Sequence, residues 1–254
     1  MSAEILSTGY ELLIGRVINS NAAYLGADLT KRGYSVRRIV CVGDDMETVG
    51  MAVRESLSRK PSVLVCTGGL GPTFDDLTAT SVAWALETKV TLNASAAELI
   101  AKRYSAMGLP VTDERLKMAM LPYGCEILVN EVGTAPGFAV KAGSSWVVCM
   151  PGVPSEMKAM WTTYGDRYAP KVGSLFETSF EIMGVPESSA APLIAEFMSK
   201  NPYLYIKSHP KGKEQASILE IHVYAMGSDQ RLKDKVEEVA GGLRQSLEAM
   251  SRNR

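Results

Sequence analysis

The sequence predicts an α/β fold: a mostly parallel β-sheet covered by helices on both faces, in three layers. Two observations predict it. Short apolar runs alternate with segments of helical periodicity up to Pro170, and such alternation is typical of strands in a parallel sheet joined by helices. The pattern changes after Pro170, which predicts a second, smaller α+β domain. We therefore divide the chain into residues 1–170 and 174–254.

The elements of the first domain follow from periodicity and from the residues that end each element. Apolar runs predict four strands, at residues 3–9, 36–45, 61–71 and 145–150. Apolar residues at helical spacing predict helices at residues 20–34, 46–59, from Asp76 onward and after the turn at 151–154. Gly33 is the expected C-cap of the first of these helices.

The second domain has a different order of elements. We predict strands at residues 177–185, 203–208 and 217–225, and helices at residues 187–200 and 228–250. The resulting βαββα order suits a small α+β domain of the split-βαβ type. A polar segment, residues 209–216, is expected to be a solvated loop. It contributes to a basic group whose members are Lys207, His209, Lys211 and Lys213.

Composition narrows the classes of function. The chain has 254 residues, with 27 basic and 28 acidic side chains, so it lacks the basic excess of a typical nucleic-acid binder. No apolar run is long enough to span a membrane, and no basic segment leads into an apolar one at the N-terminus. The four cysteines form no CxxC pair and are expected to be reduced. These features indicate a cytoplasmic protein with no membrane partner.

Polar segments follow three strands of the predicted sheet. STGYELLIG follows the first strand, VGDD the second and CTGGLGPTFDD the third. Because ligands bind at the carboxyl ends of strands in an open parallel sheet, we expect these segments to form one site.

The glycine-rich segment is a candidate phosphate-binding loop. Gly68, Gly69 and Gly71 allow positive φ angles or close approach of a ligand to the backbone, and Thr73 and Thr78 could add hydroxyl groups. The alternative is a tight strand-to-helix turn that needs no ligand. The segment is neither a Walker loop nor GxGxxG.

Paired aspartates are the second component of the expected site. One of Asp75 and Asp76 could be a helix N-cap, which leaves the other unexplained, and Asp44 and Asp45 repeat the pairing. Carboxylates are the ligands that Mg²⁺ and Mn²⁺ prefer, and these ions commonly bridge to phosphates. We expect Asp44 and Asp76, with Glu11, to bind a divalent metal that assists hydrolysis of a pyrophosphate. Asp75 is a further catalytic candidate.

Two Gly/Pro-rich turns offer weaker candidates. Thr134 lies in NEVGTAPGF and Gly152 in PGVPSEM, and both are candidates for contact with the substrate. Ordinary turn formation explains either segment equally well. Glu156 is interpreted as a cap of the helix that it opens rather than as a metal ligand.

Five motifs in this order resemble the competence/damage-inducible protein A (CinA) family: GYELLIGRVINSNAAYLGADLTKRGY, VGDD, TGGLGPTFDDLT, NEVGTAPGF and PGVPSEM. The resemblance covers about residues 3–165 and implies a first domain of the molybdopterin-binding, molybdenum-cofactor-biosynthesis type. The βαββα segment resembles the KH-like middle domain of these proteins. It shows no GxxG clamp, so nucleic-acid binding is not expected. The sequence ends before an equivalent of the family's deamidase domain, so deamidase activity is not expected either.

The resemblance also implies an activity. A CinA-like protein would be a metal-dependent ADP-ribose pyrophosphatase that forms AMP and ribose 5-phosphate, with FAD as a related substrate. Asp44 and Asp76 match the aspartates that relatives use in metal-assisted chemistry, and Mg²⁺, Mn²⁺ or Co²⁺ would be the metal. Asp75 has no counterpart in the simpler pattern. The resemblance further implies a homo-oligomer, such as a dimer. The rival hypothesis is a non-catalytic protein that binds molybdopterin or a nucleotide.

Overall fold

The computed structural model describes residues 1–211 and 218–252. It divides into two compact units. The first contains Met1–Thr30 and Tyr34–Lys171, and the second contains Lys31–Gly33 and Val172–Arg254. The first unit is built on a mostly parallel sheet with helices on both faces and the second on an antiparallel sheet, which confirms the predicted fold class.

A six-stranded sheet forms the centre of the first unit, in the order β2-β1-β3-β8-β7-β6. Its strands are β1 (Ser2–Thr8), β2 (Ser35–Val42), β3 (Val63–Thr67), β6 (Glu126–Leu128), β7 (Gly137–Ala142) and β8 (Ser145–Met150). The first four strands in the sheet order are parallel, and β7 and β6 follow in antiparallel pairs. The chain moves from β1 to β2 on one side and then to β3 on the other. The carboxyl ends of β1 and β3 therefore flank a topological switch point, where ligands bind in such sheets.

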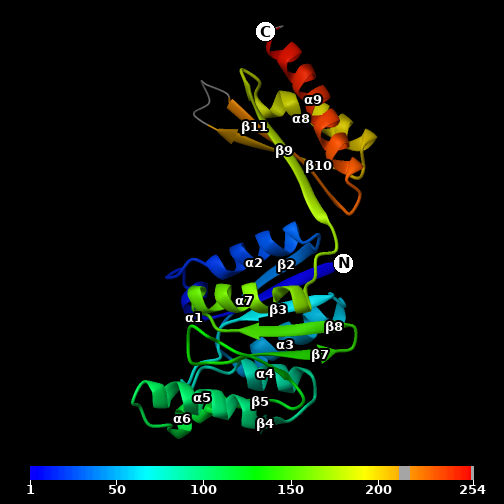
Figure 1. Ribbon diagram of the computed structural model, residues 1–254. Helices are drawn as coiled ribbons and strands as arrows, with labels where there is room; N and C mark the ends of the chain where they lie inside the picture. Colours follow the sequence, from blue (N-terminus) through cyan, green and yellow to red (C-terminus); the bar gives the residue numbers. More distant parts are fainter. Residues whose placement is uncertain (212–217, 253–254) are drawn as a thin grey trace. The chain divides into compact units, whose positions relative to one another are not determined.

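Helices cover both faces of this sheet (Figure 1). One face is covered by α2 (Ser20–Lys31) and α7 (Pro154–Tyr168), and the other by α3 (Met46–Ser58) and α4 (Thr78–Ala85). Leu6, Leu64 and Cys66 pack with residues of α3 and α4 in one buried core. Strands β2 and β3 end earlier than predicted, at Val42 and Thr67, because the glycines and aspartates that follow turn the chain away from the sheet.

The segment between α4 and β8 holds elements that the periodicity did not predict. They are β4 (Val90–Leu92), α5 (Ala94–Ala106), α6 (Asp113–Lys117), β5 (Met120–Pro122), β6 and β7. β4 and β5 pair antiparallel as a separate two-stranded sheet. A short helix, α1 (Tyr10–Leu13), follows β1 directly.

The second unit has the predicted βαββα order. It consists of β9 (Ser174–Met183), α8 (Glu187–Lys200), β10 (Tyr205–Lys211), β11 (Ile218–Gly227) and α9 (Arg231–Arg252), and its three strands form an antiparallel sheet in the order β10-β11-β9. Alternate residues of β11 are buried against a core that the two helices share.

One predicted loop of the second unit is wrong. β10 continues to Lys211, so His209 and Lys211 are strand residues rather than parts of a solvated loop, whereas Lys207 lies in a strand as predicted. Lys211 forms ion pairs with Glu220 of the adjacent strand β11 and with Glu181 of β9, the strand beyond it. The strand end at residues 209–211 is exposed throughout, so its sequence shows no alternation that would predict a strand. Lys213 lies outside the described residues.

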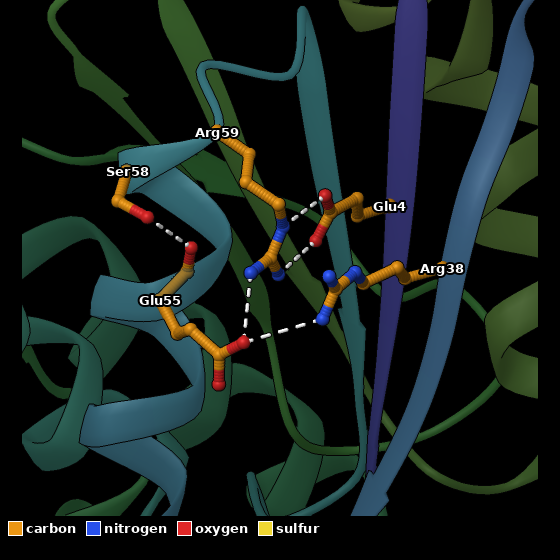
Figure 2. Close-up of polar contacts among 5 residues, drawn as sticks. All are labelled: Glu4, Arg38, Glu55, Ser58 and Arg59. Carbon is orange, nitrogen blue, oxygen red and sulfur yellow. Dashed lines mark hydrogen bonds and ion pairs between the residues drawn. The ribbon is translucent and has the colours of Figure 1, made fainter.

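A buried carboxylate near the start of β1 has a complete set of partners (Figure 2). The side chain of Glu4 is 2% exposed and receives hydrogen bonds from Arg59 Nε at 2.7 Å and Nη2 at 2.6 Å. Arg59 also pairs with Glu55, which in turn contacts Arg38. A two-point Arg–carboxylate pair of this kind compensates the cost of burying the charge.

Among the described residues, no helix combines the length and the apolar character needed to cross a membrane.

Candidate active site

A pocket of about 540 Å³ opens at the carboxyl ends of the parallel strands. This volume is in the range of small-molecule sites. The three polar segments that follow β1, β2 and β3 all contribute to its lining, as does the segment that follows β8. The predicted site residues in the lining are Glu11, Asp44, Gly68, Gly69, Gly71, Thr73, Asp75, Asp76, Thr134 and Gly152. The sheet thus brings these residues together.

The glycine loop is held close to neighbouring backbone. Gly68 has φ +100°, and a Cβ at this position would lie 2.2 Å from the carbonyl oxygen of Thr8. Gly69 has φ +66°, and its Cβ would lie 2.3 Å from Thr78 Oγ1. Only glycine fits these two positions, because an added side chain would meet both steric conflict and an unfavourable φ.

The loop offers some of its amide groups to a ligand, but not all. The Gly68 N–H donates to Met150 O at 3.0 Å, so this amide is already used. The Gly69 and Gly71 N–H groups donate to no acceptor in the described part of the chain. Of the three predicted glycines, these two have an N–H group that could bind a phosphate oxygen.

Thr78 has a different position from the one predicted. It is 1% exposed and does not line the pocket. Its hydroxyl donates to Gly68 O at 2.8 Å, and its N–H donates to Gly69 O at 3.1 Å. Thr78 therefore supports the glycine loop from behind instead of contacting a ligand.

The two aspartates after β2 have separate functions. Asp45 is the N-cap of α3, and its carboxylate accepts from Thr48 N at 2.8 Å. Asp44 lines the pocket and accepts from Tyr10 N at 2.7 Å. The capping alternative thus explains Asp45 and leaves Asp44 for the site.

The next pair, Asp75 and Asp76, does not cap a helix. α4 begins at Thr78, and its N-cap is Leu77 without a side-chain hydrogen bond. Asp76 Oδ2 instead accepts from Thr73 N at 2.8 Å and Thr73 Oγ1 at 2.7 Å. The Thr73 hydroxyl lies within hydrogen-bond distance of Asp75 as well, and its single hydrogen is donated to one of the two carboxylates at a time. Both carboxylates are therefore available at the pocket, and the predicted cap is wrong for each.

The electrostatics of the pocket are strongly acidic. Burial raises the pKa of Asp44, and the charges of Glu11, Asp75 and Asp76 raise it further against the opposing Tyr10 N–H. The hydrogen bond from Thr73 lowers the pKa of Asp75, with a smaller contribution from Lys117. Among the described residues, no lysine or arginine lines the pocket. Such a group of carboxylates favours a cation between them.

These carboxylates do not form a ready-made metal site. In residues 1–211 and 218–252, no three acidic, histidine or cysteine side chains converge so as to hold a metal ion. The predicted set of Asp44, Asp76 and Glu11 is thus not assembled by the protein alone. Mg²⁺ sites of enzymes often use one or two carboxylates and complete the shell with substrate phosphates and water. The residues present fit that arrangement.

A buried hydroxyl at the switch point also points to a ligand. Thr8 lines the pocket and is 5% exposed, yet its Oγ1 has no hydrogen-bond partner among the described residues. An unpaired buried hydroxyl costs about 1–3 kcal/mol. A bound polar molecule would remove that cost. The sequence placed Thr8 in the segment STGYELLIG, which was expected to contribute to the site, but gave no signal that singled out this residue.

Glu156 is the second residue that sequence reasoning misplaced. The N-cap of α7 is Val153, with Pro154 in the first turn, so Glu156 is not a cap. It lines the pocket, and its Oε2 accepts from Asn130 Nδ2 at 2.7 Å. The partner, Asn130, showed no sequence signal of its own, since it lay in a segment interpreted as a turn.

Comparisons with known proteins agree with this architecture. The family described as "Probable molybdopterin binding domain" matches residues 4–170. A protein of Pyrobaculum calidifontis is 46% identical over 228 residues, covering 88% of this chain and 87% of that protein, and one of Metallosphaera sedula is 39% identical over 254 residues, covering 99% and 94%. The crystal structure of CinA of unknown function from Thermoplasma acidophilum is 39% identical, covers 66% of this chain and 97% of that one, and superposes with a TM-score of 0.62. The chain belongs to the family of probable molybdopterin-binding domains and is CinA-like.

Proposed function

We propose that this protein is a divalent-metal-dependent hydrolase of nucleoside-diphosphate-linked compounds, and that ADP-ribose is its substrate, cut to AMP and ribose 5-phosphate. The observation that carries the proposal is the composition of the pocket. Free glycine-loop amides stand beside Asp44, Asp75 and Asp76 with no basic side chain in the described lining. A pyrophosphate accompanied by a divalent cation satisfies both groups at once, whereas either ion alone satisfies one.

Each residue has a defined task in this proposal. The Gly69 and Gly71 N–H groups would donate to phosphate oxygens, and the Thr8 hydroxyl would donate from the floor of the pocket. Asp44 and Asp76 would hold the metal together with the phosphates, with Glu11 close by. A bound Mg²⁺, Mn²⁺ or Co²⁺ would neutralise charge and polarise a phosphoryl oxygen. Thr73 would keep Asp76 in place through its two hydrogen bonds.

The test is release of AMP from ADP-ribose by the purified chain, measured by chromatography with Mg²⁺, Mn²⁺ or Co²⁺ and with a chelator. We expect turnover that requires a divalent metal. Asp44→Asn and Asp76→Asn should each lower kcat/KM by about 10²-fold or more, as removal of a group that stabilises transition-state charge does.

Asp45→Asn is the matched control, because Asp45 neighbours Asp44 in sequence but caps α3 outside the pocket. It should retain wild-type turnover. Absence of AMP with every metal, or full activity of Asp76→Asn, would contradict the proposal.

A second candidate is a non-catalytic protein that binds molybdopterin or a nucleotide. The description of the matching family favours it. The same pocket would then hold a phosphate without cutting it. Calorimetric titration with molybdopterin and with ADP-ribose, run beside the AMP assay, separates the two: binding without product would support this candidate.

A further inference from the structure

We propose that Glu156 takes the proton from the water that attacks the pyrophosphate, and that Asn130 is the residue that positions it. This inference rests on the proposed hydrolase function and assigns a catalytic residue within the same pocket. Three observations carry it: the hydrogen-bond network around Glu156, the packing of its carboxylate, and its separation from the other acids.

Asn130 is fully engaged in the network. It is 8% exposed, and its Nδ2 donates to Glu156 Oε2 at 2.7 Å and to Ala135 O at 3.0 Å. Its Oδ1 accepts from Val132 N at 3.1 Å and Gly133 N at 2.8 Å. These four contacts fix the direction of the amide. One oxygen of Glu156 is consequently held in place.

The loop that carries Asn130 is itself braced by α5. Arg103 Nε donates to Gly133 O at 2.9 Å, and its Nη2 donates to Asn130 O at 3.3 Å and also contacts Glu131 O. A Cβ on Gly133 would lie 2.1 Å from Glu156 Oε2, so the carboxylate rests against a position that only glycine leaves open. This degree of support is typical of a side chain that must keep one geometry.

Glu156 stands apart from the acids that would hold the cation. It enters the pocket from α7 and is held by the loop before β7, whereas the others follow β1, β2 and β3. The unpaired Thr8 hydroxyl in the same pocket independently indicates a bound polar molecule. Glu156 thus reaches the pocket from a different element than the acids proposed to hold the cation.

The step balances with these groups alone. The water oxygen forms a bond to phosphorus while the bond from that phosphorus to the bridging oxygen breaks, and the bonding electron pair leaves with the second phosphate. Glu156 accepts the proton of the water and later releases it to solvent. The products are two phosphate monoesters, AMP and ribose 5-phosphate, and no electrons are gained or lost.

The test compares turnover with binding. Glu156→Gln keeps the size of the side chain and its contact with Asn130 but removes the base. We expect kcat for ADP-ribose to fall about 10²–10⁴-fold, the usual contribution of a general base. The Kd of α,β-methylene-ADP with Mg²⁺, measured by calorimetry, should change by less than about threefold. Glu131→Gln, an exposed acid on the same loop that does not line the pocket, is the control and should match wild type.

Asn130→Ala tests the positioning role. Its kcat should fall while the Kd of the analogue stays near that of wild type. The double variant Asn130→Ala/Glu156→Gln should lose no more than Glu156→Gln alone, because a residue that acts through another is non-additive with it. Additive losses would show that Asn130 acts independently and would overturn this part.

Near-wild-type kcat in Glu156→Gln would overturn the assignment while leaving the hydrolase intact. A tenfold or larger weakening of analogue binding with kcat retained would do the same, since it would make Glu156 a binding residue. If Glu156→Gln fails to fold by circular dichroism, Glu156→Asp replaces it, with the same expected split between kcat and Kd. If wild type releases no AMP from ADP-ribose, the proposed function falls and this inference falls with it.

Discussion

Acidic side chains at the two ends of β1 have opposite surroundings. Near its start, Glu4 is almost fully buried and has a two-point pair with Arg59 (Figure 2). Beyond its end, Glu11 shares a pocket with Asp44, Asp75 and Asp76, and no described basic side chain lines that pocket. The same sheet therefore pairs one carboxylate with an arginine inside the fold and places a group of carboxylates in a pocket that no described basic side chain lines.

The difference separates structure from function. A buried charge that only supports the fold must be paired, since an unpaired one destabilises the native state. Carboxylates kept together without a partner raise the free energy of the empty protein, and binding of a cationic ligand relieves the repulsion. The pair at Glu4 is thus interpreted as structural and the pocket as a ligand site. The following predictions test that contrast.

The largest change in stability is expected when Glu4 loses its partner Arg59. Arg59→Ala leaves the buried Glu4 carboxylate without its two hydrogen bonds, which we expect to lower the free energy of unfolding by about 3–5 kcal/mol. Urea unfolding at neutral pH measures it. The contrast would be weakened if Arg59→Ala unfolded at the wild-type urea concentration.

Acid should reduce the contribution of the Glu4–Arg59 pair to the free energy of unfolding. Burial works to raise the pKa of Glu4, but the hydrogen bonds from Arg59 and Ser56 and the nearby positive charges outweigh it, so the pKa lies below its ordinary value of 4.5. The stabilisation is therefore complete above pH 4.5 and is lost as the pH falls through the lowered pKa. Between pH 7 and pH 3, the free energy of unfolding should fall more steeply for wild type than for Glu4→Gln. Parallel curves would argue against this assignment.

At the pocket end of β1, removal of a charge should stabilise the protein, which is opposite to the effect expected at Arg59. Asp44→Asn keeps an acceptor for the Tyr10 N–H but relieves the repulsion from Glu11, Asp75 and Asp76. Without divalent metal, we expect this variant to be more stable than wild type by about 0.5–1 kcal/mol, as is common when functional strain is removed. Thermal melts in a chelator check this. A clear loss of stability would mean that Asp44 has a structural role.

The smallest effect is expected at Asp45. Asp45→Ala removes the carboxylate that accepts from Thr48 N at the start of α3. The melting temperature should fall slightly, because the first turn of the helix loses a hydrogen-bond acceptor, and AMP release should not change. A loss of turnover as large as that of Asp44→Asn would show that the two neighbours do not have separate functions.

The sequence indicated the fold well wherever elements were long and periodic. The parallel strands and the helices between them have apolar faces wide enough to be recognised. The strands β4, β5 and β6 were missed because each has three residues, too few to show an alternation. The helix α5 was missed because its buried face consists of only three residues, Ala96, Ile100 and Tyr104. The end of β10 was missed because His209, Pro210 and Lys211 are all exposed and therefore show no alternation of apolar and polar side chains.

The candidate site was predictable in part for a similar reason. The residues after β1, β2 and β3 could be grouped because parallel strands end at the same edge of the sheet. Glu156 and Asn130 could not be assigned, since their link joins a turn and a helix through side chains 26 residues apart in sequence. Which aspartate of a pair is a cap also depends on the residue where the helix begins, and that boundary is the least certain feature of a sequence pattern.

The most direct test of the account is whether metal and nucleotide bind together. Calorimetry would measure the Kd of α,β-methylene-ADP with Mg²⁺ and in a chelator, for wild type and for Asp44→Asn. Because the described carboxylates need phosphate oxygens to complete a metal shell, we predict that Mg²⁺ tightens nucleotide binding to wild type about tenfold or more, and that Asp44→Asn loses most of this gain. Equal affinity with Mg²⁺ and with chelator would contradict the account.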